Sequence, residues 1–312
     1  MKIGVYAPRR SSFPLVGPPA LEAIKRGHQV TLLQDSRGAQ IGDQWRPHEA
    51  NLAFPGVAGV MDAARYRGDW ILGPLLTPRP DIKTASLEPW LDGLAKPYAD
   101  AAEVSHRTMR HGLVSTDAVA GCAIGLTDQV VWFLPKTRVP GLLNRAMRYL
   151  TMLVTARALK RVCWSHKMTL VLKTRTKIRV PTALRDLPLV GEEDLYPAPA
   201  IRLIASSRLV VCHQSAAALE AAALGTPCVN IRVPVPHLRA YPQYTLMTMR
   251  TQSPMAWPGV VLSLSLRELV RHRSIFIGAD ASARRAYLDT WLGGKVWGAS
   301  SWVLDRMERR SS

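Results

Sequence analysis

The segment of residues 207 to 232 constrains the fold of this chain more than any other part of it. It reads SRLVVCHQSAAALEAAALGTPCVNIR, so an apolar run is followed by a polar turn, an alanine-rich stretch and a second apolar run. Gly225 and Pro227 predict that a helix ends between the two runs, because these residue types commonly follow helix C-termini. A strand, a helix and a strand in this order predict a parallel α/β unit.

A second unit of this kind begins the chain. The runs KIGVYA (2–7) and QVTLLQ (29–34) have the composition of strands, and ALEAIKRG between them has that of a helix. We expect Pro18 and Pro19 to open this helix and Gly27 to end it. The N-terminal part of the chain therefore predicts a strand, helix and strand as well.

Further apolar runs at 130–134 and 168–173, separated by a helical pattern over 142–162, continue the alternation. A chain of 312 residues is long enough for two domains with separate cores. We therefore predict an α/β protein with two Rossmann-like domains facing a cleft, the first over residues 1–127 and the second over 128–312.

The net charge of +18 is concentrated in one part of the sequence. No acidic residue occurs between Asp128 and Asp186, and thirteen basic residues do. They are Lys136, Arg138, Arg145, Arg148, Arg157, Lys160, Arg161, Lys167, Lys173, Arg175, Lys177, Arg179 and Arg185. Charge of one sign repels itself, so this stretch indicates an anionic partner, the alternative being a solvated basic face.

An anionic membrane surface is one such partner. The helical pattern over 142–162 carries an apolar stripe beside arginines, which is typical of a helix that lies on a membrane. The longest apolar stretch, 114–135, is interrupted by Asp117 and Asp128, so we expect no membrane-spanning helix. The N-terminus lacks the pattern of a signal peptide. We expect a cytoplasmic protein that binds peripherally to the inner face of the cell membrane.

The four cysteines, Cys122, Cys163, Cys212 and Cys228, form no CxxC pair. We therefore expect reduced and mostly buried thiols rather than disulfides or a zinc site. No other metal-ligand pattern is present, and we predict neither a metal nor a bound cofactor.

The polar turn after residue 212 has the properties of an anion site. Ser215 is the expected N-cap of the helix, and free backbone N–H groups at a helix N-terminus bind phosphate. Glu220 follows among alanines, where its carboxylate can accept hydrogen bonds from the vicinal hydroxyls of a ribose. The alternatives are an ordinary cap for Ser215 and a core residue for Glu220.

The same segment resembles the donor-binding segment of two-domain nucleotide-sugar glycosyltransferases of the GT-B fold. The resemblance implies that Gln214, Ser215 and Ala216 bind the donor diphosphate and that Glu220 binds its ribose. The stretch ALEAIKRGHQVTLL is similar to the first helix and second strand of that family's N-terminal domain.

The run TLVLKTRTK resembles members that act on bacterial surface polysaccharides or polyol phosphates, which implies that Lys173 and Arg175 face the diphosphate. A solvated strand edge is the alternative for these two cations. Open α/β sheets bind ligands beyond the carboxyl ends of their strands, so His213 and the group Arg9, Arg10 and Ser11 are further candidates.

The resemblance implies an enzyme that transfers a sugar from a nucleotide sugar to a glycolipid or surface-polysaccharide acceptor. The non-hydrolysing UDP-N-acetylglucosamine 2-epimerases share the fold and a similar segment, so epimerisation is the alternative reaction. A basic nucleic-acid-binding protein is the alternative of another class. Few aromatic residues interleave the basic stretch, and no nucleic-acid-binding module is recognisable, so no specific nucleic acid is expected.

No pattern in the sequence identifies a catalytic base. Acidic residues and histidines of the first domain are possible bases, but none lies in a recognisable motif. They are Asp35, His48, Glu49, Glu103 and His106.

Overall fold

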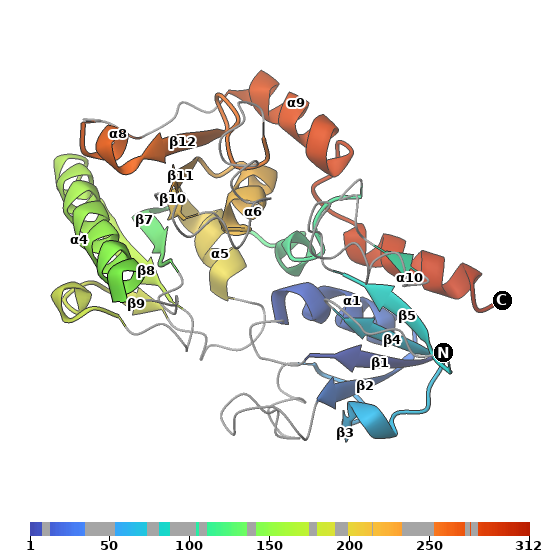
Figure 1. Ribbon diagram of the computed structural model, residues 1–312. Coiled ribbons are helices and arrows are strands. Elements are labelled where there is room, and N and C mark those ends of the chain that lie inside the picture. The colour runs from blue at the N-terminus through green and yellow to red at the C-terminus, as the bar shows by residue number, and fades with distance from the viewer. Residues whose placement is uncertain are drawn as a thin grey trace. The chain divides into compact units, whose positions relative to one another are not determined.

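The computed structural model divides the chain into two compact units. Unit 1 comprises residues 1–121, 194–201 and 291–312, and unit 2 comprises 122–193 and 202–290 (Figure 1). The structure describes residues 1–7, 13–34, 54–73, 81–87, 104–105, 111–135, 142–174, 180–190, 199–213, 215–232, 253–271, 275 and 280–312.

Unit 1 contains a parallel six-stranded sheet in the order β3-β2-β1-β4-β5-β6. Its strands are β1 (Lys2–Tyr6), β2 (Gln29–Gln34), β3 (Val60–Asp62), β4 (Trp70–Gly73), β5 (Lys83–Ser86) and β6 (Val104–Ser105). Short 3-10 helices cover Ala63–Arg65 and Thr116–Val119. The first two strands match the predicted runs, and Gly27 between them has φ 80°, a conformation that glycine adopts without strain.

The first helix, α1 (Phe13–Lys25), begins earlier than predicted. Pro18 and Pro19 lie inside it and do not open it. Proline has the φ angle of a helix, but it lacks the N–H group and its ring crowds the carbonyl four residues back, so each costs α1 a backbone hydrogen bond. Val16, Ala20 and Ala23 of this helix are buried against the sheet, and this packing outweighs the lost bonds.

The C-terminal helix α10 (Ala299–Arg309) packs in unit 1, whereas the sequence suggested that all of 128–312 belongs to the second domain. Its residues Ala299, Val303, Leu304 and Met307 are buried in the core that β1, β2 and β4 form with α1. These positions share one helix face, and α10 is amphipathic for that reason. The sequence shows such a face but not the sheet against which it packs.

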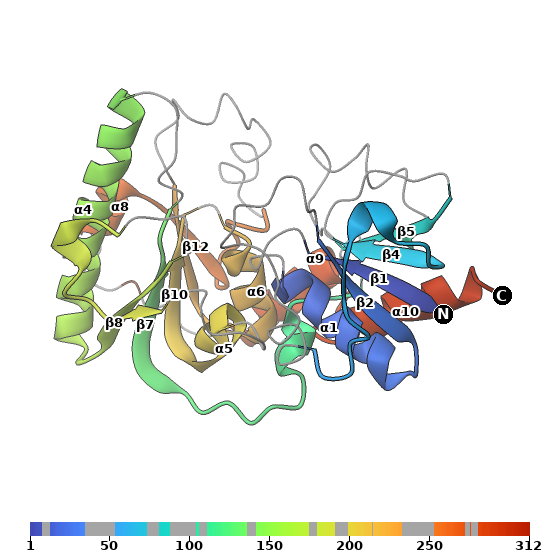
Figure 2. The same ribbon diagram turned by 90° about the horizontal axis from the view of Figure 1, so that it is seen from below.

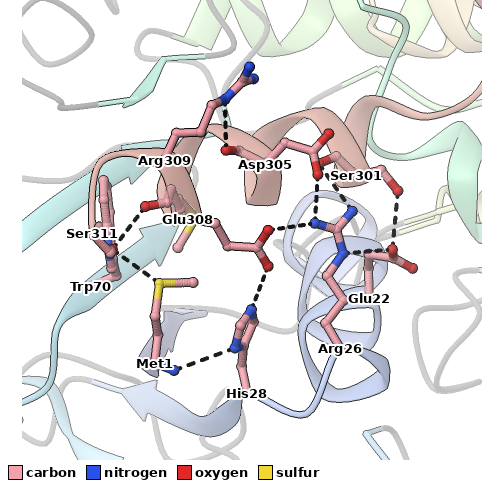
Figure 3. Close-up of polar contacts among 11 residues, drawn as sticks. Met1, Glu22, Arg26, His28, Trp70, Ser301, Asp305, Glu308, Arg309 and Ser311 are labelled. Atoms are coloured by element: carbon pink, nitrogen blue, oxygen red, sulfur yellow. Dashed lines mark hydrogen bonds and ion pairs between the residues drawn. The ribbon is translucent and has the colours of Figure 1, made fainter.

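Polar contacts join α1 to α10 (Figure 3). Arg26 donates to Glu22 at 3.0 Å, to Asp305 at 2.7 Å and to Glu308 at 3.1 Å. His28 contacts the other carboxylate oxygen of Glu308 at 2.8 Å. The chain end is thus held to the first helix by ion pairs as well as by its apolar face.

Unit 2 contains a second parallel six-stranded sheet, in the order β12-β11-β10-β7-β8-β9. Its strands are β7 (Thr127–Phe133), β8 (Thr169–Lys173), β9 (Leu189–Val190), β10 (Ser207–Cys212), β11 (Cys228–Arg232) and β12 (Val261–Ser265). The helices are α4 (Leu142–Ser165), α5 (Pro199–Ser206), α6 (Ala217–Leu224), α8 (Leu266–Arg271) and α9 (Ala281–Leu292), with a 3-10 helix at Thr182–Leu184. Residues 199–201 of α5 and 291–292 of α9 fall in unit 1.

Helices cover both faces of this second sheet. In both views α4 and α8 lie on one face, and α5 and α6 lie on the other (Figures 1 and 2). Val130, Trp132, Leu172 and Val211 point toward α4 and join its buried residues in one apolar core. The prediction of an α/β fold with two parallel sheets is confirmed.

Candidate functional site

The carboxyl ends of three neighbouring strands bring polar side chains to one edge of the second sheet. The order β10-β7-β8 places Trp132 at the end of β7 between Lys173 at the end of β8 and His213, which directly follows β10. Neighbouring strands lie about 4.8 Å apart, so β8 and β10 are about 10 Å apart. Because side chains alternate along a strand and Leu172 points toward α4, Lys173 points to the opposite face, and it is Trp132 and His213 that meet.

A buried hydrogen bond fixes the orientation of His213. The indole Nε1–H of Trp132 donates to Nε2 of His213 at 3.0 Å, and the two rings are tilted by 45°. Indole nitrogen can only donate, so Nε2 must accept. A neutral imidazole with Nε2 as acceptor carries its proton on Nδ1. The contact with Trp132 therefore selects the Nδ1–H tautomer of His213.

Burial keeps this histidine neutral. The side chain is 8% exposed, and desolvation, with a smaller contribution from the positive charge of Arg148, lowers the pKa of His213 to about 3. Nδ1 has no hydrogen-bond partner among the described residues. A buried N–H group without a partner costs free energy, so this donor is available for an acceptor that a ligand supplies.

Arg148 reaches this region from α4. It is four residues before Met152 and eleven before Leu159, so it lies on the same helix face as these buried side chains. Desolvation lowers the pKa of its guanidinium. Arginine stays charged at neutral pH even so, and a cation is thereby placed near His213.

Arg148 also lines a pocket between α4 and the segment 180–189, with a volume of about 850 Å³. Small-molecule sites commonly have volumes of about 300 to 1,000 Å³ and are mostly apolar with a few polar groups. The walls are Arg148, Tyr149, Met152, Val180, Pro181, Thr182, Leu184, Arg185, Leu187 and Leu189. The pocket and the histidine thus share one cation.

The turn after β10 leads into α6 with a small difference from the prediction. The N-cap is Ala216, which has helical backbone angles and no side-chain cap bond, and Ser215 is one residue further out. The Ser215 hydroxyl accepts a hydrogen bond from the N–H of Ala217 at 3.3 Å. Ser215 is therefore not the N-cap that the sequence predicted, although its hydroxyl still accepts from the first turn of α6, two residues on.

Glu220 lies in the first turn of α6 and is partly exposed, although the alanines around it are buried. A carboxylate in this turn also interacts favourably with the positive end of the helix dipole. The end of α6 matches the prediction, because Gly225 is its C-cap with φ 81°. Arg284 of α9 donates to the carbonyl oxygens of Ala222 and Ala223 there.

The remaining predicted residues divide into two groups. Lys173 is buried, with Nζ donating to the carbonyl oxygen of Thr174 at 2.9 Å, so it is not a solvated edge residue. The other five lie outside the described residues: Arg9, Arg10, Ser11, Arg175 and Gln214.

Sequence reasoning missed Trp132 and Arg148. Trp132 is 81 residues from His213 along the chain, and no local pattern relates the two. A signal for Arg148 was present, because it interrupts an otherwise apolar face of the helical pattern. An arginine at such a position indicates a buried cation.

The described residues also bear on the predictions about metal-binding groups, membrane-spanning helices and disulfides. The described residues contain no group of three or more His, Cys, Asp or Glu side chains placed to hold a metal ion. No helix among them is long and apolar enough to span a bilayer. All four cysteines are free, and Cys122 is exposed whereas the other three are buried.

Comparison with known proteins identifies the fold. No family model and no curated protein sequence matches the chain. Solved structures do. The S. aureus MnaA–UDP co-structure aligns with a TM-score of 0.59 at 9% identity, covering 99% of this chain and 96% of that one.

Two further structures align over nearly the whole chain. UDP-GlcNAc 2-epimerase from Neisseria meningitidis bound to UDP-GlcNAc has a TM-score of 0.56 at 9% identity, covering 99% of this chain and 100% of that one. The wall teichoic acid polymerase TagF with CDPG has a TM-score of 0.53 at 9% identity, covering 99% and 89%. The chain has the GT-B fold of nucleotide-sugar epimerases and glycosyltransferases, as predicted.

Proposed function

We propose that this protein is a glycosyltransferase that binds a nucleotide-sugar donor on unit 2 and transfers the sugar to a glycolipid or surface-polysaccharide acceptor. The observation that supports it most is the neutral His213, whose Nδ1–H group has no partner among the described residues at the junction of β10 and α6. An acceptor oxygen of a donor diphosphate would satisfy this group.

Two other groups near the junction suit a diphosphate. The Ser215 hydroxyl can donate, and Arg148 contributes a positive charge that acts on His213. The pocket beside Arg148 has room for the nucleoside part of the donor. Glu220, in the first turn of α6, is proposed to accept hydrogen bonds from the ribose.

These groups would act on the leaving diphosphate. In the transfer, the bond between the sugar C1 and the diphosphate oxygen breaks, and the acceptor hydroxyl oxygen bonds to C1. The acceptor proton passes to a base that we do not assign. Negative charge grows on the departing oxygen, where donors fixed in advance stabilise it more than water would.

Epimerisation at C2 of the sugar is the second candidate. One of the structures reported above is a UDP-GlcNAc 2-epimerase bound to UDP-GlcNAc, which favours testing this reaction. Incubation with UDP-GlcNAc and separation of the products distinguishes the two. An epimerase gives the 2-epimer of the nucleotide sugar without an acceptor, whereas a transferase gives free nucleotide only when an acceptor is present.

Calorimetric titration with uridine, UDP, CDP, GDP and their sugars tests the binding site. Glu220→Gln should weaken binding of nucleotides by about 1.5–3 kcal/mol and should weaken binding of the free nucleoside equally, because both contain the ribose. Glu268→Gln is the matched control, since Glu268 also lies in the first turn of a helix of unit 2. If the Glu220 variant binds all ligands normally, the ribose assignment is wrong.

Ser215→Ala should affect diphosphates by about 1 kcal/mol and leave uridine binding unchanged, since the hydroxyl faces the phosphate side. Ser265→Ala is its control, because that hydroxyl accepts from the N–H of Glu268 in the same way at another helix. Equal effects of both serine variants on diphosphate binding would contradict the proposed site.

A further inference from the structure

Exposed large apolar side chains gather on one part of unit 2. Single exposed apolar residues are normal on soluble proteins, but a group of them marks an interaction surface. Within the described residues, six of the nine exposed large apolar side chains belong to α4, β9 or α8. The nine are Met61, Leu126, Met147, Tyr149, Leu150, Trp164, Leu189, Val270 and Trp297.

The most exposed of them share the outer face of α4. Leu150 is 52% exposed and Trp164 is 85% exposed, and the two are fourteen residues apart, or four turns. Arg157 and Arg161 lie between them at helical spacing and are exposed as well. We call these four residues the α4 outer face. It extends about 21 Å along the helix, opposite the buried side that includes Met152, Leu159 and Val162.

Charge on this face has one sign. α4 contains no acidic residue, and none occurs in the sequence between Asp128 and Asp186. Lys160 of α4 pairs with Asp186 at 2.7 Å, and Arg161 donates to the carbonyl oxygen of Val270 at 2.7 Å. No ion pair to Arg157 occurs within the described residues. The face therefore presents cations beside a leucine and a tryptophan.

We propose that unit 2 binds an anionic lipid bilayer through the α4 outer face, with α4 parallel to the membrane plane. Tryptophan is enriched at the boundary between headgroups and acyl chains, and Leu150 would enter the same layer. Arg157 and Arg161 would contact lipid phosphates. This inference depends on α4 alone and does not require the proposed nucleotide site.

Other partners fit the face less well. A second copy of the chain would bring the same cations against each other, which disfavours a symmetric contact through α4. A nucleic acid would use the arginines, but it offers nothing to an exposed leucine. A bilayer with anionic headgroups satisfies both the positive charge and the apolar side chains.

Sedimentation of the full chain with vesicles tests the proposal. One set contains phosphatidylcholine alone, and the other contains phosphatidylcholine and phosphatidylglycerol in equal parts. We expect most of the protein to sediment with the anionic vesicles at low salt and little of it to sediment with the neutral vesicles. Arg157→Glu should lower partitioning at least fivefold, because each cation near such a surface contributes about 1 kcal/mol. Arg65→Glu in unit 1 makes the same change in net charge and should have a smaller effect.

Trp164→Ser tests the apolar part, with Trp297→Ser as its control because Trp297 is also exposed but lies in unit 1. We expect severalfold weaker binding from the first and no change from the second. Equal loss from the two arginine variants, or no loss from Trp164→Ser, would overturn the proposal. The proposal would also be overturned if a polynucleotide released the protein from anionic vesicles and bound the Trp164→Ser variant as tightly as the unaltered protein. UDP titration of the same samples reports separately on the nucleotide site.

Discussion

Two partly buried arginines, Arg26 in unit 1 and Arg148 in unit 2, have opposite shifts in pKa. Burial acts to lower the pKa of Arg26, but the hydrogen bonds that it donates to Asp305 and Glu22, together with the charges of Asp305 and Glu308, outweigh it and raise the pKa. For Arg148, burial alone is the cause, and the pKa is lowered. The neighbours of Arg26 thus outweigh its burial, whereas burial determines the direction of the pKa shift of Arg148.

This difference separates structure from function in the two units. The carboxylates around Arg26 join α1 to α10 and hold the end of the chain in unit 1. Arg148 lies beside a pocket and acts electrostatically on a buried histidine. A positive charge at the wall of a pocket favours the binding of an anionic ligand.

The largest effect is expected from the apolar face of α10. Leu304→Ala removes a fully buried side chain from the unit 1 core and should lower the free energy of unfolding by about 2–5 kcal/mol. Nucleotide affinity, measured below the unfolding temperature, should stay unchanged. Arg309→Ala, on the exposed side of the same helix, is the control in the denaturation experiment. If Leu304→Ala lowered nucleotide affinity without lowering the free energy of unfolding, nucleotide binding could not be assigned to unit 2 alone.

Exchange of the two arginines for apolar residues tests the comparison directly. Arg26→Met should destabilise the protein by about 1 kcal/mol, because the ion pairs are partly exposed, and should leave nucleotide binding intact. Arg148→Leu should weaken diphosphate binding by about 1.5–3 kcal/mol, because it removes the positive charge beside the site. Denaturation and calorimetry on both variants measure the two effects. A reversed pattern would contradict the assignment of roles.

The histidine gives a pH-dependent effect. Its pKa is lowered to about 3 in the folded protein from an ordinary value of 6.5, so below pH 6.5 the unfolded state binds a proton that the folded state does not. The contribution of His213 to the free energy of unfolding is therefore fully present above pH 6.5. It is lost as the pH falls toward 3, by about 1 kcal/mol between pH 6.5 and 5.5. His213→Gln should have a flatter stability profile in this window. Identical profiles would show that His213 titrates normally.

The smallest effect is expected at Trp132. Trp132→Phe keeps an aromatic ring but removes the N–H donor, so both tautomers of His213 become available. Diphosphate affinity should fall by about 1 kcal/mol, with no change for uridine. Trp70→Phe is the control, because that indole donates to Ser311 and both residues belong to unit 1. Histidine ¹⁵N spectra of the Trp132 variant should show a mixture of tautomers, which a purely structural loss would not produce.

Sequence alone predicted the parts of the molecule that local patterns encode. Apolar runs located β1, β2, β7, β8, β10 and β11, and helical periodicity located α4. Short or peripheral strands were missed: β3, β5, β6, β9 and β12. Strands of two to four residues carry too little pattern to be recognised, and the five-residue β12 lies at the edge of its sheet, where the neighbouring strand offers it hydrogen bonds.

The site was predicted in part for the same reason. Ser215 and the Gly225 C-cap follow from residue type and position along the chain. The bond from Trp132 to His213 depends on the pairing of β7 with β10, which no local signal encodes. The course of α10 back to unit 1 likewise depends on contacts between the two ends of the chain.

The proposed site depends on a neutral His213 whose Nδ1–H group donates to the diphosphate. Histidine ¹⁵N spectra of the full chain, recorded at neutral pH with uridine and then with UDP, CDP and GDP, test this directly. We predict an Nδ1–H tautomer throughout, an Nδ1 signal that shifts with the nucleoside diphosphate bound and not with uridine, and an Nε2 signal that hardly changes because Trp132 still donates to it. Binding of a diphosphate that leaves the Nδ1 signal of His213 in place would contradict the account.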